Sequence, residues 1–341
     1  MSEDFSDVRR LMAPFDPAPP ESFDGAADAP EARATLRRIL ATPPRRGLTR
    51  RSVLAVAGVA ALASDAAAHT ELRPAVTVGM LSYRRMEGGS PLPGGLPSAR
   101  PALLELSRVA GRRPAEVRPA GARYDHIVTN TWGLNVAVSG GRTSTAVVPS
   151  VVEVWTPVSP PDLVRRVERP GRPIVIGYGD ETTAAEVAAG NSPSDELLTG
   201  VTVSPSPEDL PLDPPSLRRA LLTAAPRPES YLLVQAVIRL FSERYVPSRL
   251  AAALWRMLAD ERDLRLLGET TDRAGRKGWA FALDVPLRLP RRLVMIIDPD
   301  SGRLISSEEI LTEDAGKLNV AIPAVIGYTL FLGRSRVPSA R

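Results

Sequence analysis

Cysteine is absent from this chain of 341 residues, and histidine occurs only twice, at His69 and His126. The absence of cysteine excludes disulfide bonds, thiolate nucleophiles and cysteine-ligated metals. Two histidines are too few for a metal site built from several imidazoles. The chain also has no G-x-S-x-G, H-E-x-x-H or S-x-x-K motif. We therefore expect no cofactor and no catalytic residues, and the sequence does not indicate an enzyme.

Lysine is nearly as scarce, since Lys277 and Lys317 are the only lysines among the 43 basic residues. The net charge is +4, and the arginines are dispersed, often beside acidic residues. A nucleic-acid-binding surface needs clustered basic residues with aromatic side chains between them. Nucleic acid is therefore not expected as a partner.

One apolar run, Val53–Ala63, contains only Val, Leu, Ala and Gly. A comfortable membrane-spanning helix needs about 20 apolar residues, so this run is short, and Asp65 would lie near the far interface. Residues 52–69 are still predicted to cross the membrane, as a marginal span.

The flanks of this segment predict its orientation. Arg45, Arg46, Arg50 and Arg51 precede the run closely, whereas acidic residues follow it. An excess of arginine holds its side of a span in the cytoplasm. The expected localisation is the cell membrane, single-pass, with the N-terminus cytoplasmic and the C-terminal domain outside.

Two other interpretations of this segment stay open. The Arg50-Arg51 pair before the apolar run resembles a twin-arginine export signal, and Ala66 to Ala68 offers an A-x-A cleavage site. Cleavage there would release the rest of the chain. The segment could also be an alanine-rich helix in the core of a soluble protein.

Composition divides the chain into five parts. The first is acidic and proline-rich at its start and has too little apolar surface for a core, so it is predicted to be largely disordered. The expected parts are a cytoplasmic tail (1–51), a transmembrane or signal segment (52–69), a linker (70–100), an extracytoplasmic domain (101–334) and a C-terminal tail (335–341).

Within the domain, strand and helix patterns occur in blocks. From Tyr124 polar and apolar residues alternate, which is typical of strands, and short turns between them require antiparallel pairing. Pro149 predicts an edge or a bulge in its strand, and residues 179–214 are predicted to be a surface excursion. Helices are predicted at 101–110, 215–224, 229–243 and 248–261.

Two glycine-containing segments carry several charges. Asp298–Gly302 (DPDSG) could suggest a calcium loop, but strand patterns flank it, so a hairpin turn is predicted. Asp272–Gly278 is basic, but it precedes a strand rather than a helix. This segment too is predicted to be a turn, with contact between its basic side chains and anionic headgroups as the weaker alternative.

The region 249–311, together with Tyr124–Trp132, Glu153–Trp155 and Tyr328–Leu332, resembles a family of uncharacterised actinobacterial membrane-anchored proteins. Members are often encoded beside extracytoplasmic-function sigma factors. More weakly, the domain resembles the lipoprotein-carrier and RseB-like half-barrel. The expected fold class is therefore α+β, with a curved antiparallel sheet packed on helices, preceded by a single transmembrane helix and a short tail.

These expectations imply a membrane-anchored, non-enzymatic binding or sensing protein. The resemblance implies an apolar ligand on the curved sheet, and a sigma factor or other cytoplasmic regulator as partner of the N-terminal tail. The alternative is a secreted lipid or lipoprotein carrier released by cleavage near Ala68.

Overall fold

The computed structural model describes residues 77–84, 86, 95–139, 142–159, 163–171, 174–175, 192–222, 229–318 and 320–340. The predicted tail and the predicted transmembrane or signal segment at 52–69 lie outside the described residues. The predicted linker is described only in part, at 77–84, 86 and 95–100.

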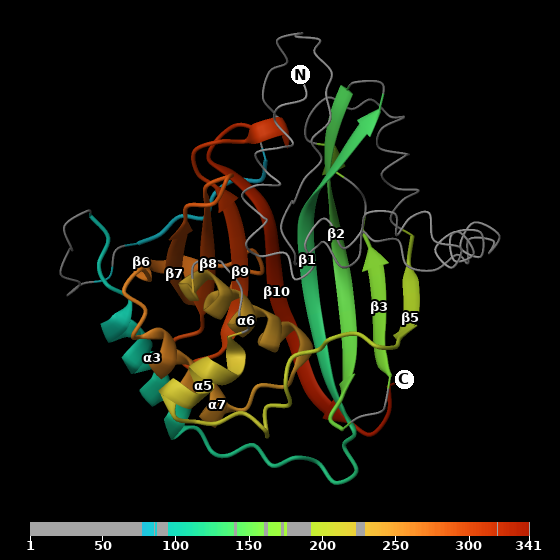
Figure 1. Ribbon diagram of the computed structural model, residues 1–341, viewed down its shortest axis with the longest axis vertical. Helices are drawn as coiled ribbons and strands as arrows, with labels where there is room; N and C mark the ends of the chain where they lie inside the picture. Colours follow the sequence, from blue (N-terminus) through green and yellow to red (C-terminus); the bar gives the residue numbers. More distant parts are fainter. Residues whose placement is uncertain are drawn as a thin grey trace, which may run out of the picture. The chain divides into compact units, whose positions relative to one another are not determined.

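A single large antiparallel sheet dominates the structure (Figure 1). Nine strands follow one another in the order β5-β3-β2-β1-β10-β9-β8-β7-β6, and β4 pairs with β2 beside this path. Every pair is antiparallel, as the short turns predicted. The strands are β1 (Tyr124–Ser139), β2 (Arg142–Pro157), β3 (Val164–Pro170), β4 (Ile174–Val175), β5 (Ser194–Leu198), β6 (Arg265–Thr271), β7 (Lys277–Val285), β8 (Arg291–Ile297), β9 (Leu304–Leu311) and β10 (Ala324–Val337).

Four α-helices of the described residues lie together over one face of this sheet (Figure 1). They are α3 (Arg100–Arg112), α5 (Pro214–Leu221), α6 (Glu229–Glu243) and α7 (Ser248–Leu258). Local signals set their starts, because proline occupies the first turn of α3 and α5 and the carboxylate of Asp213 accepts from the amide of Ser216.

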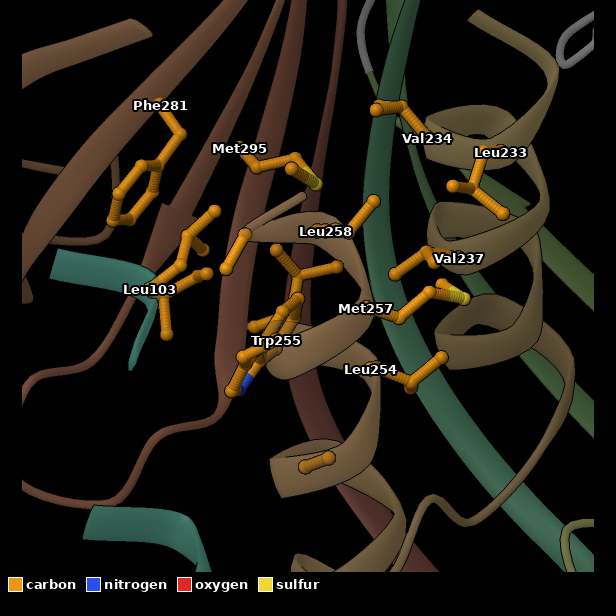
Figure 2. Packing of buried hydrophobic residues seen from close by; sticks show 14 of the residues in the cluster. Leu103, Leu233, Val234, Val237, Leu254, Trp255, Met257, Leu258, Phe281 and Met295 are labelled. Atoms are coloured by element: carbon orange, nitrogen blue, oxygen red, sulfur yellow. The ribbon is translucent and has the colours of Figure 1, made fainter. Parts of the chain in front are cut away.

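The main core lies between these helices and strands β6–β9. Trp255 and Leu258 of α7 are buried together with Phe281 of β7 and Met295 of β8. Figure 2 shows Met257 of the same helix on the side that faces α6. Helix α7 is therefore apolar on almost every side because it packs against helices as well as against the sheet.

The predicted fold class was wrong in two respects. The described chain is mainly sheet rather than α+β, since ten strands form one sheet and the helices cover only part of one face. The transmembrane helix in that prediction is not supported either, because the structure's described helices are all too short or too polar to span a bilayer.

Two local predictions also need correction. The surface excursion predicted at 179–214 contains β5, which pairs with β3. Pro149 lies in a strand that has neighbours on both sides, at a local gap in the pairing on the side of β3 and β4. It lies where the partner of β2 changes from β3 to β4, and its carbonyl accepts from the amide of Gly171 at 2.6 Å. A proline is tolerated there because no ladder hydrogen bond needs its missing N–H.

Candidate functional site

The sheet separates into two branches between β9 and β10. The last paired residues of these strands are Ser306 and Leu330. From Phe331 onward β10 pairs only with β1, down to the pair of Val337 with Tyr124. The separation leaves backbone groups on both branches without a ladder partner.

The guanidinium of Arg276 bridges the two branches. Its Nη1 donates to the carbonyl of Phe331 at 2.7 Å and its Nη2 donates to the carbonyl of Ile305 at 2.6 Å. The carboxylate of Asp272 accepts from Nε at 2.8 Å and holds the group in place. Arg276 comes from the turn between β6 and β7, so the predicted turn at 272–278 is confirmed, and this arginine faces protein rather than lipid.

A cavity of about 490 Å³ opens beside this separation. Its walls are partly apolar, with Phe241 from α6 and Leu332 from β10 among them, and partly cationic. The lining residues are Ile127, Phe241, Arg244, Arg276, Asp298, Ser301, Arg303, Leu304, Ile305, Phe331, Leu332, Gly333 and Arg334. Four arginines thus face a single carboxylate, and cationic and apolar groups share one space.

Arg244 is almost completely occupied by protein partners. It is 5 % exposed and donates to the carbonyls of Pro157 at 2.6 Å and Ser204 at 2.9 Å. Burial lowers the pKa of Arg244, against the opposing charge of Asp125, which lies 3.9 Å away. Arg244 therefore contributes charge to the cavity, while its Nε and Nη1 are bonded to backbone carbonyls.

Arg334 also lines the cavity. It bonds the carbonyl of Val246, pairs with Glu116 at 3.3 Å and lies over the ring of Tyr245 at 4.5 Å. Burial lowers the pKa of Arg334, and the positive charge of Arg303 lowers it further. Tyr245 and the carboxylate of Glu116 oppose this shift without reversing it.

Arg303 adds positive charge beside Arg334 in the same cavity. It is half-buried, and its Nε is buried without a hydrogen-bond acceptor among the described residues. The one carboxylate of the cavity, that of Asp298, is used inside its own turn, where it accepts from the Ser301 hydroxyl and from the Asp300 amide at 3.0 Å. A guanidinium donor that lacks an acceptor is suited to bind an anion.

The turn that carries Arg303 is fixed against the helices. Gly302 has φ +66°, and its carbonyl accepts from the indole Nε1 of Trp255 at 2.7 Å. The hairpin turn predicted at 298–302 is therefore confirmed. Within the described residues no cluster of three or more acidic or histidine side chains is placed to hold a metal.

The residues named from the sequence do not form this site. Arg45, Arg46, Arg50, Arg51, Ala66 and Ala68 all lie outside the described residues. Arg244, Arg303 and Arg334 are far apart along the chain and meet only in the folded structure, so their positions in the sequence did not predict a shared cavity. The sole local signal was an arginine directly after the DPDSG turn.

The fold and cavity define a β-sheet domain with helices on one face and an arginine-lined pocket at a strand separation. No protein-family model matches the chain, and no curated protein matches it. Among solved structures the chain is similar to the crystal structure of MucB, with 15 % identity, a TM-score of 0.22, and coverage of 70 % of this chain and 58 % of that chain.

The similarity to MucB is distant. Its TM-score is too low to carry an argument about fold or function. The actinobacterial family and its linkage to sigma factors therefore stay predictions from the sequence.

Proposed function

We propose that this chain is a non-enzymatic binding protein whose cavity holds a ligand with an anionic group and an apolar part. The observation that carries this proposal is Arg303, whose buried Nε lacks an acceptor among the described residues while apolar side chains line the same cavity. The anionic group would meet Arg303, and the apolar part would lie along Phe331 and Leu332.

Titration with dodecyl phosphate and with dodecanol tests this proposal, because the two probes share an alkyl chain and differ in charge. We expect dodecyl phosphate to bind more tightly. Replacement of Arg303 by Gln should weaken its binding by roughly 10- to 150-fold, the equivalent of about 1.5–3 kcal/mol for a hydrogen bond to a charged group.

The matched control is Arg256→Gln, which removes the same charge from an exposed position on α7. Its affinity for dodecyl phosphate should stay close to that of the native chain. Equal affinity for the two probes, or an equal loss in the two variants, would reject the cavity as an anion site. Replacement of Leu332 by Ser should weaken the binding of both probes to the same extent.

We also propose that the described domain acts outside the cytoplasm in a pathway of sigma-factor regulation. The arginines at 45–51 and the resemblance of residues 249–311 support this placement. Cell fractionation, intact mass and pull-down of a C-terminally tagged chain test it. Retention of residues 1–51 and capture of a sigma factor support the regulatory role, whereas a mature chain that begins near His69 favours the carrier alternative.

A further inference from the structure

The sheet face opposite the helices has its own apolar cluster, and residues 77–84 lie across it. Ala280, Val294 and Ile296 belong to this cluster. Val78, Leu81 and Tyr83 pack against it from outside the sheet. We call residues 77–84 the strap.

The strap is not a regular strand, and hydrogen bonds join it to β6. Arg84 and Glu269 exchange two backbone hydrogen bonds of 2.7 and 2.8 Å. The hydroxyl of Thr270 donates to the carbonyl of Ser82 at 2.8 Å. The side chains of Arg84 and Glu269 also pair, but the Arg84 side chain is 83 % exposed, so water screens this ion pair.

A buried ion pair lies beneath the strap. The Glu308 side chain is 0 % exposed, and its Oε1 accepts from Nε of Arg273 at 2.7 Å. Nη2 of the same Arg273 donates to the carbonyl of Gly79 in the strap at 3.0 Å. Arg273 therefore connects the buried carboxylate directly to the strap.

Two polar atoms at this point have no hydrogen-bond partner among the described residues. They are Oε2 of Glu308 and the hydroxyl of Tyr83, and both are buried. A buried charge with an unbonded oxygen costs free energy that hydration would recover. Tyr83 is part of the strap, so lifting the strap would expose both groups to water.

The ionisation of these groups is coupled. Burial raises the pKa of Glu308, Arg273 opposes this, and the charge of Asp272 adds to it. Burial and the Glu308 charge raise the pKa of Tyr83 to about 12, with Arg273 and Arg292 opposing. Tyr83 therefore stays neutral where Glu308 titrates. Burial also raises the pKa of Tyr328, with the charge of Arg273 opposing and that of Glu308 adding to the shift.

We propose that the strap docks reversibly on this face of the sheet and that protonation of Glu308 controls the docking. With Glu308 protonated, its second oxygen no longer carries negative charge without a hydrogen bond, and Arg273 keeps its own charge and its bond to the carbonyl of Gly79. With Glu308 ionised, release of the strap lets water reach its second oxygen. Burial in the docked state raises the pKa of Glu308, so docking is favoured at low pH. Docking is lost as the pH rises from 4.5, the ordinary pKa of a glutamate, through the raised pKa of Glu308.

Hydrogen exchange of the strap amides in the full chain, corrected for the intrinsic pH dependence of exchange, tests this proposal. Protection should fall by up to about tenfold per pH unit within that window, since one proton is linked to release. In Glu308→Gln protection should stay high and independent of pH. A native profile without pH dependence would overturn the proposal.

The matched control is Glu309→Gln, which alters the adjacent carboxylate that pairs with Arg291 and not with the strap. Its strap should keep the native pH profile. Tyr83→Phe removes only the unpaired hydroxyl and should keep the pH dependence as well. Identical profiles for Glu308→Gln and the native chain would show that another group controls the strap.

Discussion

Arginine side chains bond backbone carbonyls where the described strands end or separate. Arg276 joins Phe331 to Ile305 across the branch between β9 and β10, and Arg244 bonds the carbonyl of Pro157 at the end of β2. A planar guanidinium presents several donors in fixed directions, whereas an ammonium is a single point of charge. The scarcity of lysine in this chain agrees with that use of arginine.

At the same scale, Gly302 is a position where a side chain is poorly tolerated. It has φ +66°, and a Cβ there would lie 2.8 Å from Cβ of Ala110 in α3. Gly302→Ala should destabilise the fold by about 2–5 kcal/mol, from backbone strain and overpacking together. Urea unfolding of the variant measures this loss.

Gly275 provides the control, because its φ is +80° but nothing lies within 4 Å of an added Cβ. Gly275→Ala should cost only the strain, about 1–2 kcal/mol. Equal losses in the two variants would show that the hairpin turn is not packed against α3 as the structure has it.

At the scale of elements, α7 holds the helical layer together. Small residues Ala251–Ala253 let α3 approach closely, and the hydroxyl of Ser107 donates to the carbonyl of Ala252 at 2.7 Å. The amide of Ser248 at the start of α7 is bonded at 3.0 Å by the distant carboxylate of Glu116. The helix is therefore fixed by tertiary contacts at its end and along its length.

Truncation of Leu258 tests this role of α7. Leu258 is 0 % exposed, and Leu258→Ala should destabilise the protein by about 2–5 kcal/mol because a cavity replaces the side chain. Arg256→Ala, on the exposed side of the same helix, should change stability by no more than about 0.5 kcal/mol. Thermal and urea unfolding would compare the two, and similar losses would contradict the position of α7 in the core.

At the scale of the whole molecule, carboxylates join segments that are far apart in sequence. Burial tends to raise the pKa of Glu116, but hydrogen bonds from Ser248 and the charge of Arg334 outweigh it, so the pKa is lowered. The pKa of Glu208 is lowered in the same way, with a hydrogen bond from Ser206 and the charge of Arg336 overcoming burial. Both groups favour the folded state when ionised.

Stability should therefore decrease in acid. A carboxylate with a lowered pKa contributes stability above its ordinary pKa of 4.5, and this contribution is lost as pH falls through the lowered value. Melting temperatures measured from about pH 3 to pH 7 should fall on the acid side. In Glu116→Gln the melting temperature should decrease less on the acid side. An unchanged dependence of the melting temperature on pH would contradict the role of Glu116.

Local patterns predicted much of the described fold. The helix predicted at 229–243 has the bounds of α6, and the hairpin turn at DPDSG lies between β8 and β9. These features depend on residues that are neighbours in sequence. Strand β5 was missed because its short SDELL sequence gains its structure from pairing with β3 rather than from its own propensity.

Neighbouring residues were enough to specify the helices, the turns and the antiparallel pairing, because periodicity, prolines and glycines act over a few positions. Contacts between distant segments were needed to determine where the sheet divides. Such contacts bring Arg303 and Arg334 to one cavity, and they also place the strap over Glu308. The geometry of those contacts depends on register and burial. No local pattern reports these quantities, because a charged side chain that is exposed in the unfolded chain acquires its burial and its partners only on folding.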